Sequence, residues 1–207
     1  FTINAATGAL SFNSSPDFES PTDADSNNTY LVEVTATDDR VPVTSKVRLY
    51  TVTVTDANDG VTILQGTEVN ATISEDGNWT SPGTAPDINA SDPDGNETLS
   101  LVWTKQSGPS NGDANVSGTG ANPNIVYVPN KNWCSIAGFQ DTFVIRVTEP
   151  GGLYDEITVK VTVISQNDPP EFTSSDYFSA DENQTAIATL TASDPDLGDS
   201  ITFKKTG

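Results

Sequence analysis

The chain lacks histidine, has a single cysteine and only nine lysine and arginine residues, and contains no run of 18 apolar residues. Without histidine, the commonest general base and metal ligand is missing, which excludes Ser-His catalysis and ordinary zinc chemistry. Cys134 cannot form an internal disulfide and, beside Trp133, is interpreted as a small buried or half-buried thiol. Because no apolar run is long enough, we expect no membrane span in this segment.

Positive charge is scarce and negative charge abundant. The formal net charge of -20 arises from 29 Asp and Glu residues against nine Lys and Arg residues. Nucleic acids and anionic membranes are both held through Lys and Arg, so this composition argues against either as a partner. It favours cations instead. The acids lie between apolar alternations and not in one block, which disfavours disorder.

Apolar and polar residues alternate along most of the chain, and nothing recurs at a helical period. The alternation predicts short strands, the signature of β-sandwich modules. Residues 30–36 and 47–55 are expected to pair as an antiparallel hairpin, and a turn around Gly8 is expected to divide residues 1–12 into two strands. Further strands are predicted at residues 61–64, 69–73, 98–105, 125–128, 142–148, 154–164, 171–173, 186–192 and 201–204.

All three tryptophans lie between residues 60 and 168. Trp103 lies inside a strand pattern, so we expect it in the core. Trp79 and Trp133 lie in predicted loops, where they can be exposed.

A strand end followed by an Asn-Asp pair occurs twice. Residues 51–59, TVTVTDAND, correspond to residues 161–168, VTVISQND, and each is followed by a new segment. We interpret them as junctions between three segments: residues 1–59, the closing part of a module; residues 60–168, a complete β-sandwich; and residues 169–207, the opening part of another. A 39-residue piece cannot bury a sandwich core. The chain is therefore predicted to be a window of a longer array, whose end segments are completed by missing sequence or by a neighbouring chain.

Oxygen-bearing side chains also recur. Residues 89–96, NASDPDGN, correspond to residues 191–199, TASDPDLGD, and Glu75 and Glu182 lie near the start of their segments. Calcium takes six to eight oxygen ligands, many of them carboxylate, so these residue types suit calcium better than a softer metal. The alternative is that Asp-Pro and Asn-Asp clusters only cap turns through side-chain hydrogen bonds.

Together these motifs resemble cadherin repeats in their bacterial form and the related tandem domains of large bacterial surface proteins. The resemblance implies an all-β fold made of tandem Ig-like or cadherin-like Greek-key β-sandwich modules in a linear array. The segments that carry it are PDFE (16–19), VTATD (34–38), DAND (56–59), ASDPD (90–94), YVPNKNW (127–133), DTFVIRVTEPGG (141–152) and QNDPP (166–170).

In that family, acids from the end of one repeat, the linker and the start of the next repeat hold calcium. The resemblance implies a first-junction site formed by Asp17, Glu19, Asp38, Asp56, the Asn58 backbone carbonyl, Asp59, Asp92 and Asp94. At the second junction, Ser165 replaces an expected aspartate and Glu149 stands where Asp38 stood. The second site is therefore expected to bind fewer or weaker calcium ions, through Asp141, Asn167, Asp168, Asp194 and Asp196, with Glu75.

These features favour a non-enzymatic, calcium-stiffened segment of a large extracellular adhesin or cell-surface filament. Its expected partners are calcium ions, neighbouring repeats or copies of the same protein, and surface glycans. The alternative is a carbohydrate-binding accessory module of a secreted polysaccharide-degrading enzyme, in which exposed Trp79 and Trp133 stack on sugar rings. Paired acids also occur in glycosidases, but here they lie in junction loops without a cleft-forming insertion, which disfavours catalysis.

Overall fold

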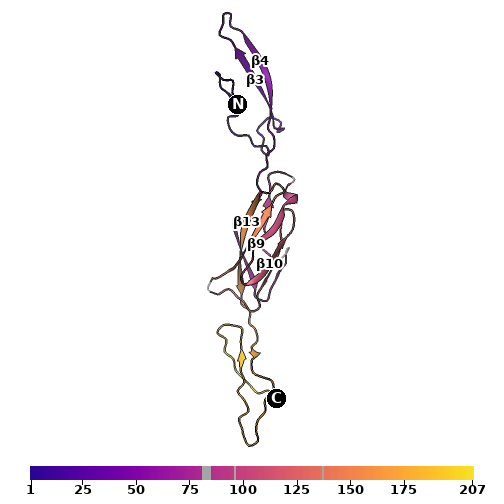
Figure 1. Ribbon diagram of the computed structural model, residues 1–207, viewed down its shortest axis with the longest axis vertical. Coiled ribbons are helices and arrows are strands. Elements are labelled where there is room, and N and C mark those ends of the chain that lie inside the picture. Colours follow the sequence, from indigo (N-terminus) through magenta and orange to yellow (C-terminus); the bar gives the residue numbers. More distant parts are fainter. Residues whose placement is uncertain (81–84, 96, 137) are drawn as a thin grey trace. The chain divides into compact units, whose positions relative to one another are not determined.

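The computed structural model describes residues 1–80, 85–95, 97–136 and 138–207. It divides into two compact units, Phe1–Asp59 and Gly60–Gly207. Figure 1 shows the course of the chain through both, coloured along the sequence. Each unit is described by itself.

The first unit contains two antiparallel strand pairs. Strand β1 (Thr2–Ile3) pairs with β2 (Leu10–Ser11), and Gly8 in the turn between them has a φ of 71°, which glycine adopts without strain. Strand β3 (Thr29–Thr37) pairs with β4 (Ser45–Thr53) along its whole length. Both hairpins confirm the sequence-based prediction.

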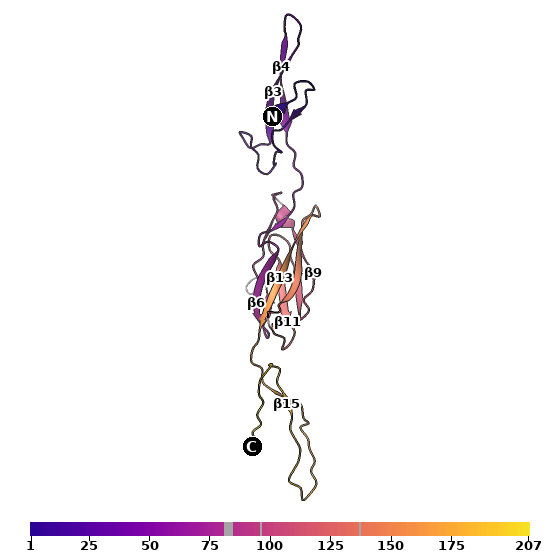
Figure 2. The same cartoon turned by 90° about the vertical axis from the view of Figure 1, so that its left-hand side faces the viewer.

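The second unit contains a β-sandwich. One sheet has the order β6 (Glu68–Ser74), β13 (Tyr154–Ile164), β12 (Asp141–Thr148), β9 (Val102–Ser107), with β6 and β13 parallel and the other neighbours antiparallel. The other sheet is formed by β10 (Gly112–Ser117), β11 (Asn124–Pro129) and β7 (Trp79–Thr80). A short pair, β5 (Thr62–Ile63) and β8 (Ala90–Ser91), lies near the start. Figure 2 shows β6, β13, β9 and β11 within this sandwich.

Alternating side chains of the two sheets form the hydrophobic core. Phe143, Ile145 and Val147 of β12 point inward, and so do the alternate residues of β13. From the other sheet, Tyr127 contacts Phe143 in a stacked arrangement with ring centroids 5.9 Å apart. The buried apolar residues of the described chain all belong to residues 61–163. The all-β sandwich fold expected from the sequence is confirmed.

One prediction about the tryptophans is wrong. Trp103 is buried as expected, but Trp79 is also buried, with 1% of its surface exposed. Its two-residue strand β7 pairs with β11, which places the indole against Tyr127 with ring centroids 5.2 Å apart. Trp133 packs partly buried against the core. The aromatic surface that the carbohydrate-binding interpretation required is therefore not formed by Trp79.

Some element boundaries also differ from the prediction. Residues 98–100 were expected in a strand but belong to a one-turn 3₁₀ helix, η1 (Glu97–Ser100). Strand β10 was not predicted. It begins at Gly112, where a Cβ atom would lie 2.7 Å from the Val128 carbonyl oxygen, so only glycine fits the close pairing with β11.

Residues 169–207 form one short antiparallel pair, β14 (Glu171–Phe172) and β15 (Ala192–Ser193). The strands predicted at 186–192 and 201–204 are otherwise absent from this described segment. Cys134 is half-buried, as expected. Within the described ranges, no helix has the length and apolar character needed to cross a membrane.

Candidate calcium-binding sites

The loop after β8 carries the first repeated aspartates. Asp92 Oδ1 accepts a hydrogen bond from the Asp94 backbone N–H at 3.0 Å, and the Asp92 N–H donates to Thr98 Oγ1 at 3.0 Å. One carboxylate oxygen of Asp92 therefore caps the turn, as the turn-capping alternative predicts. The other oxygen is left for a different partner.

Asp92 is surrounded by two further carboxylates of the same sandwich, Glu97 from η1 and Glu149 from the loop between β12 and β13. Each can direct one oxygen so that all three lie within 4.8 Å of one another. Asp92 and Glu149 are buried. Burial raises the pKa of Asp92, the hydrogen bond from the Asp94 backbone N–H opposes this, and the neighbouring carboxylates of Glu149 and Asp94 raise the pKa further. The three residues are called the entry cluster, because the chain enters the sandwich nearby.

The entry cluster contains buried oxygens with no hydrogen-bond donor in the described chain, Asp92 Oδ2 and Glu97 Oε2. Ionised carboxylates only accept, so several in one place need protons, donors or a cation. Lysine and arginine side chains form salt bridges with acids elsewhere in the chain, namely Asp113, Glu171, Glu156 and Glu68. An all-oxygen, partly buried set of this kind fits a hard cation such as calcium.

A second group lies beyond the opposite end of β13 and is called the exit cluster. It consists of Glu75, after β6, Asp168, in the connector after β13, and Asp196, in the second Asp-Pro-Asp loop; their oxygens lie within 4.8 Å of one another. The Asp168 N–H donates to Asp196 Oδ2 at 2.6 Å, and the Gln166 N–H donates to Glu75 Oε1. Glu75 is buried, and the other two acids are half-buried.

In the exit cluster, the ionised form of Asp168 is disfavoured by desolvation and by the neighbouring carboxylates. Desolvation raises its pKa, the charges of Asp76, Asp196 and Glu75 raise it further, and Lys131 partly opposes them. Asp168 Oδ2 is buried without a hydrogen-bond partner among the described residues. Like the entry cluster, this arrangement favours a cation.

The repeated motifs adopt the same local structure in both copies. Asp194 Oδ1 accepts from the Asp196 N–H at 2.9 Å, as Asp92 does from Asp94. Asn58 and Asn167 each donate from Nδ2 to the carbonyl of the following aspartate, Asp59 at 3.4 Å and Asp168 at 3.3 Å. The sequence repeats are therefore structural repeats. Asn96, expected as another oxygen donor, lies outside the described residues.

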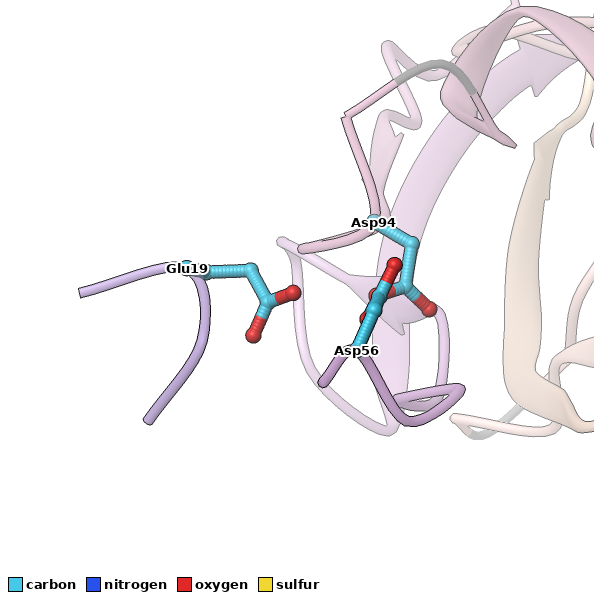
Figure 3. A group of neighbouring side chains, drawn as sticks. All are labelled: Glu19, Asp56 and Asp94. Atoms are coloured by element: carbon cyan, nitrogen blue, oxygen red, sulfur yellow. The ribbon is translucent and has the colours of Figure 1, made fainter. Parts of the chain in front are cut away.

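In the first unit, Glu19 and Asp56 can place carboxylate oxygens within 4.8 Å of each other. Figure 3 shows the Glu19 side chain pointing toward Asp56; the third side chain drawn, Asp94, belongs to the second unit. Asp17 Oδ1 accepts from the Ser20 N–H at 2.9 Å. Asp17 and Glu19 border a hollow of about 310 Å³, whose lining is Pro16, Asp17, Phe18, Glu19, Val54, Thr55, Ala57 and Asp59.

Asp38 is not brought to Asp56, contrary to the prediction. It lies at the opposite end of the β3–β4 hairpin, since β3 ends at Thr37 and β4 ends at Thr53 in an antiparallel pair. Both Asp38 oxygens accept hydrogen bonds from Thr44, at 3.0 Å from N–H and 2.7 Å from Oγ1. These bonds lower the pKa of Asp38. Asp38 caps its own turn.

Asp141 was also predicted as a ligand, and its contacts contradict this. Its buried carboxylate accepts hydrogen bonds from the Ser110 N–H at 2.8 Å, the Asn111 N–H at 3.1 Å and the Tyr127 hydroxyl at 2.9 Å. Burial and the Asp141 carboxylate raise the pKa of Tyr127. With donors on both oxygens, Asp141 fixes the loop before β10 and has no oxygen free for a cation.

Glu97 and Glu149 are the cluster members that the sequence-based set omitted. Glu149 was associated with the second junction, but it follows β12, which runs antiparallel to β13 and ends at the entry side of the sandwich. The direction of the strands was the signal that could have placed it. The same argument accounts for Asp38, which follows β3.

Residues 63–162 match the family model for the bacterial Ig domain. The sandwich, which this model covers, is similar to the bacterial Ig domain and is called the Ig domain. No curated protein matches the sequence. The chain does resemble solved cadherin structures, which confirms the cadherin-like resemblance at the level of fold.

Three of these structures cover 86% of this chain. Protocadherin gamma B2 extracellular cadherin domains 1–5 are 18% identical with a TM-score of 0.53, protocadherin gamma B7 extracellular cadherin domains 1–4 are 21% identical at 0.52, and human CDH23 EC21-23 is 22% identical at 0.52. The matches span 34%, 44% and 62% of those chains, respectively. The chain thus spans less than two thirds of the length of each of these structures, and the likeness shows the fold alone.

Proposed function

We propose that this chain is a calcium-stiffened, non-enzymatic segment of a larger extracellular adhesin or surface filament. Calcium ions bind where one module ends and the next begins, and they hold consecutive modules in a fixed relation. The partners of the segment are calcium and neighbouring repeats.

The observation that carries the proposal is the pair of carboxylate clusters at opposite ends of the Ig domain. The entry cluster contains Glu149, before β13, and the exit cluster contains Asp168, after β13. Strand β13 has 11 residues, which at about 3.3 Å per residue separates its ends by roughly 36 Å. A calcium ion that links two modules has to bind at the end of a domain, where the connector to the next module begins. The two carboxylate clusters lie at these ends.

The ligands follow from the clusters and the cadherin-like resemblance. At the entry end, Asp92, Asp94, Glu97 and Glu149 supply oxygens from the Ig domain. The resemblance supports adding Asp17, Glu19, Asp56, the Asn58 carbonyl and Asp59 from the preceding segment. At the exit end the ligands are Glu75, Asn167, Asp168, Asp194 and Asp196. Both sets offer the oxygen-only coordination of calcium.

Electrostatics supplies the stiffening. Two like charges 4 Å apart interact with about 4 kcal/mol at an effective dielectric constant of 20, so clustered carboxylates push their loops apart without a counter-ion. A calcium ion replaces the repulsion between the carboxylates with attraction to the cation, and so holds the connector against the domain. Extracellular calcium modules bind with dissociation constants of about 0.1 to 1 mM, so such sites are filled outside cells and empty in the cytosol.

The two ends are proposed to bind unequally. Asp56 is the aspartate before Asn58, whereas Ser165 takes that place before Asn167. Ser165 contributes a neutral hydroxyl, which lies 3.4 Å from Asp196 Oδ1. With one carboxylate fewer, the exit site is the weaker of the two.

Calorimetric titration of chelator-treated protein with calcium tests the proposal. We expect heat that saturates in the millimolar range or below, and a loss of the tighter binding in Asp92→Asn. Asp113→Asn is the matched control, because Asp113 is an exposed acid of the same domain. Saturable binding that is unchanged in Asp92→Asn, or no binding at all, would contradict the proposed function.

Stiffening is tested separately by small-angle X-ray scattering with calcium and with chelator. The account predicts a narrower distribution of intramolecular distances when calcium is bound. If the distance distribution is identical in both conditions, calcium does not stiffen the segment, even if it binds.

A further inference from the structure

Two acids of the entry cluster lie on a stretch of chain, between β8 and the end of η1, whose two ends are fixed to the core. Before it, the buried Ala90 donates its N–H to the Ala121 carbonyl at 2.8 Å. After it, the carbonyl of the buried Leu101 accepts a hydrogen bond from the Gly120 N–H at 2.9 Å. Adjacent residues of one segment therefore hold both ends of the loop.

The hydroxyl of Thr98, in η1, closes this loop. Asp92 directly follows β8, so its backbone groups lie beyond the strand pairing. The Asp92 N–H donates to Thr98 Oγ1 at 3.0 Å, and the Thr98 hydroxyl donates to the Asp92 carbonyl oxygen at 3.4 Å. One hydroxyl therefore satisfies both backbone polar groups of a buried residue.

The carboxylate of Asp92 depends on this backbone position. Its Oδ1 accepts a hydrogen bond from the Asp94 N–H at 3.0 Å. Its Oδ2 is buried and has no hydrogen-bond partner in the described chain, and the whole residue is only 7% exposed. Because the backbone is held on both sides and Oδ1 is engaged, the direction of Oδ2 is set before any ion binds.

The same contact sets the position of the second acid. Glu97 precedes Thr98 in η1, and the Glu97 N–H donates to the Asp94 carbonyl at 2.8 Å. The contact between Thr98 and Asp92 holds η1 against the end of β8. One oxygen from each acid of the entry cluster then lies within 4.8 Å of the others. The Thr98 hydroxyl already uses its proton and one lone pair in this contact, so its role does not require it to bind an ion.

We propose that Thr98 is a positioning residue of the entry site. Its hydroxyl holds Asp92 and Glu97 in place for a divalent cation without binding the cation itself. The inference rests on the proposed calcium site and names a residue outside the ligand set that determines its affinity. Groups that orient metal ligands in this way typically change metal affinity about 10- to 100-fold.

The test is calorimetric titration of chelator-treated residues 1–207 with calcium, below the melting temperature of each variant. Thr98→Val keeps the branched side chain but removes the hydroxyl, so the dissociation constant of the entry site should rise about tenfold. Thr98→Ser restores the hydroxyl and should bind calcium with nearly the wild-type affinity. Thr142→Val is the matched control, because Thr142 is an exposed threonine of β12 in the same domain, and its affinity should not change.

A purely structural role of Thr98 gives a different result. Thr98→Val would then lower the unfolding midpoint equally in calcium and in chelator and leave the dissociation constant unchanged, and this outcome would overturn the positioning role alone. A wild type without saturable binding would reject the calcium site itself, and the inference with it.

A measurement on the wild type covers the case in which Thr98→Val does not fold. Hydrogen–deuterium exchange in chelator should find the Asp92 amide already protected, because its bond to Thr98 forms without the ion. Protection that appears only when calcium is added would show that the ion orders the loop, and would overturn the proposal.

Discussion

Both ends of the Ig domain carry a carboxylate cluster, but the two clusters are supplied by different kinds of structural element. All three acids of the entry cluster belong to elements of one closed sandwich, and Asp92 and Glu149 are buried. The exit cluster takes only Glu75 from the sandwich, while Asp168 and Asp196 lie in the connector and the following loop. The entry site is therefore preorganised by packing. The exit cluster is joined to the sandwich through fewer packed elements, so under the proposed function a bound ion contributes more to its order than it does at the entry cluster.

The largest expected effect separates a structural acid, Asp141, from the proposed calcium ligands. Asp141→Ala removes the acceptor of three backbone N–H groups and the Tyr127 hydroxyl. Leaving these buried donors unpaired is expected to destabilise the Ig domain by about 3 kcal/mol, equally with calcium and with chelator. Urea denaturation in both conditions measures it. A loss confined to the calcium condition would return Asp141 to the ligand set.

The next effect probes the entry cluster. Asp92→Asn keeps the turn-capping oxygen but removes the charge, so calcium should lose most of its stabilising effect, about 1.4 kcal/mol at ten times the dissociation constant. In chelator the variant should melt above the wild type, because one buried, opposed carboxylate is gone. Glu149→Gln should behave alike, and Asp113→Asn should change neither condition. A variant less stable than the wild type in chelator would show that Asp92 is held by contacts other than a cation.

The raised pKa of Asp92 gives a pH test of the same end. A carboxyl whose pKa is higher in the folded state contributes stability that is present below its unfolded pKa of about 3.9 and is lost as pH rises through the folded value. In chelator, the wild type should therefore gain stability relative to Asp92→Asn as pH falls through the range above about 3.9. Parallel pH profiles of the two proteins would contradict this.

A smaller change tests the difference between the two ends. Ser165→Asp adds beside Asp196 the carboxylate that the first junction has at Asp56. We expect calcium affinity at the exit site to rise about tenfold, equivalent to about 1.4 kcal/mol. The reverse exchange, Asp56→Ser, should weaken the entry site. Calorimetry that finds the two ends already equal in the wild type would remove the proposed ranking.

The smallest expected effect concerns Tyr127. Replacing it with phenylalanine removes one hydrogen bond to Asp141 and should cost about 1 kcal/mol at neutral pH. Because the pKa of Tyr127 is raised in the folded state, this contribution is present below the ordinary tyrosine pKa of about 10 and is lost as pH rises through the folded value. Difference absorbance between wild type and variant should show one late-titrating phenol. Titration at the ordinary value would contradict the buried contact.

Strands with alternating residues, such as β3, β12 and β13, could be predicted from the sequence because each buries one face. Strand β10 could not, since only Ala114 and Val116 mark its inner face. Trp79 was misplaced because a two-residue strand leaves no periodic signal.

Acids were harder to interpret than strands. A carboxylate that accepts backbone N–H groups, such as Asp141, has the same sequence signature as one that binds an ion. Asp38 and Glu149 were assigned to the wrong ends, although the direction of their hairpins was already predictable. The sequence therefore identified the motifs, while strand direction decided which of them meet.

The central claim is tested most directly by thermal unfolding of residues 1–207 with saturating calcium and with chelator, using magnesium as the control cation. The account predicts a higher midpoint in calcium than in chelator, with magnesium having little effect, and a smaller calcium increment in Asp92→Asn. Equal midpoints in calcium and chelator would contradict the claim that the two carboxylate clusters are calcium sites.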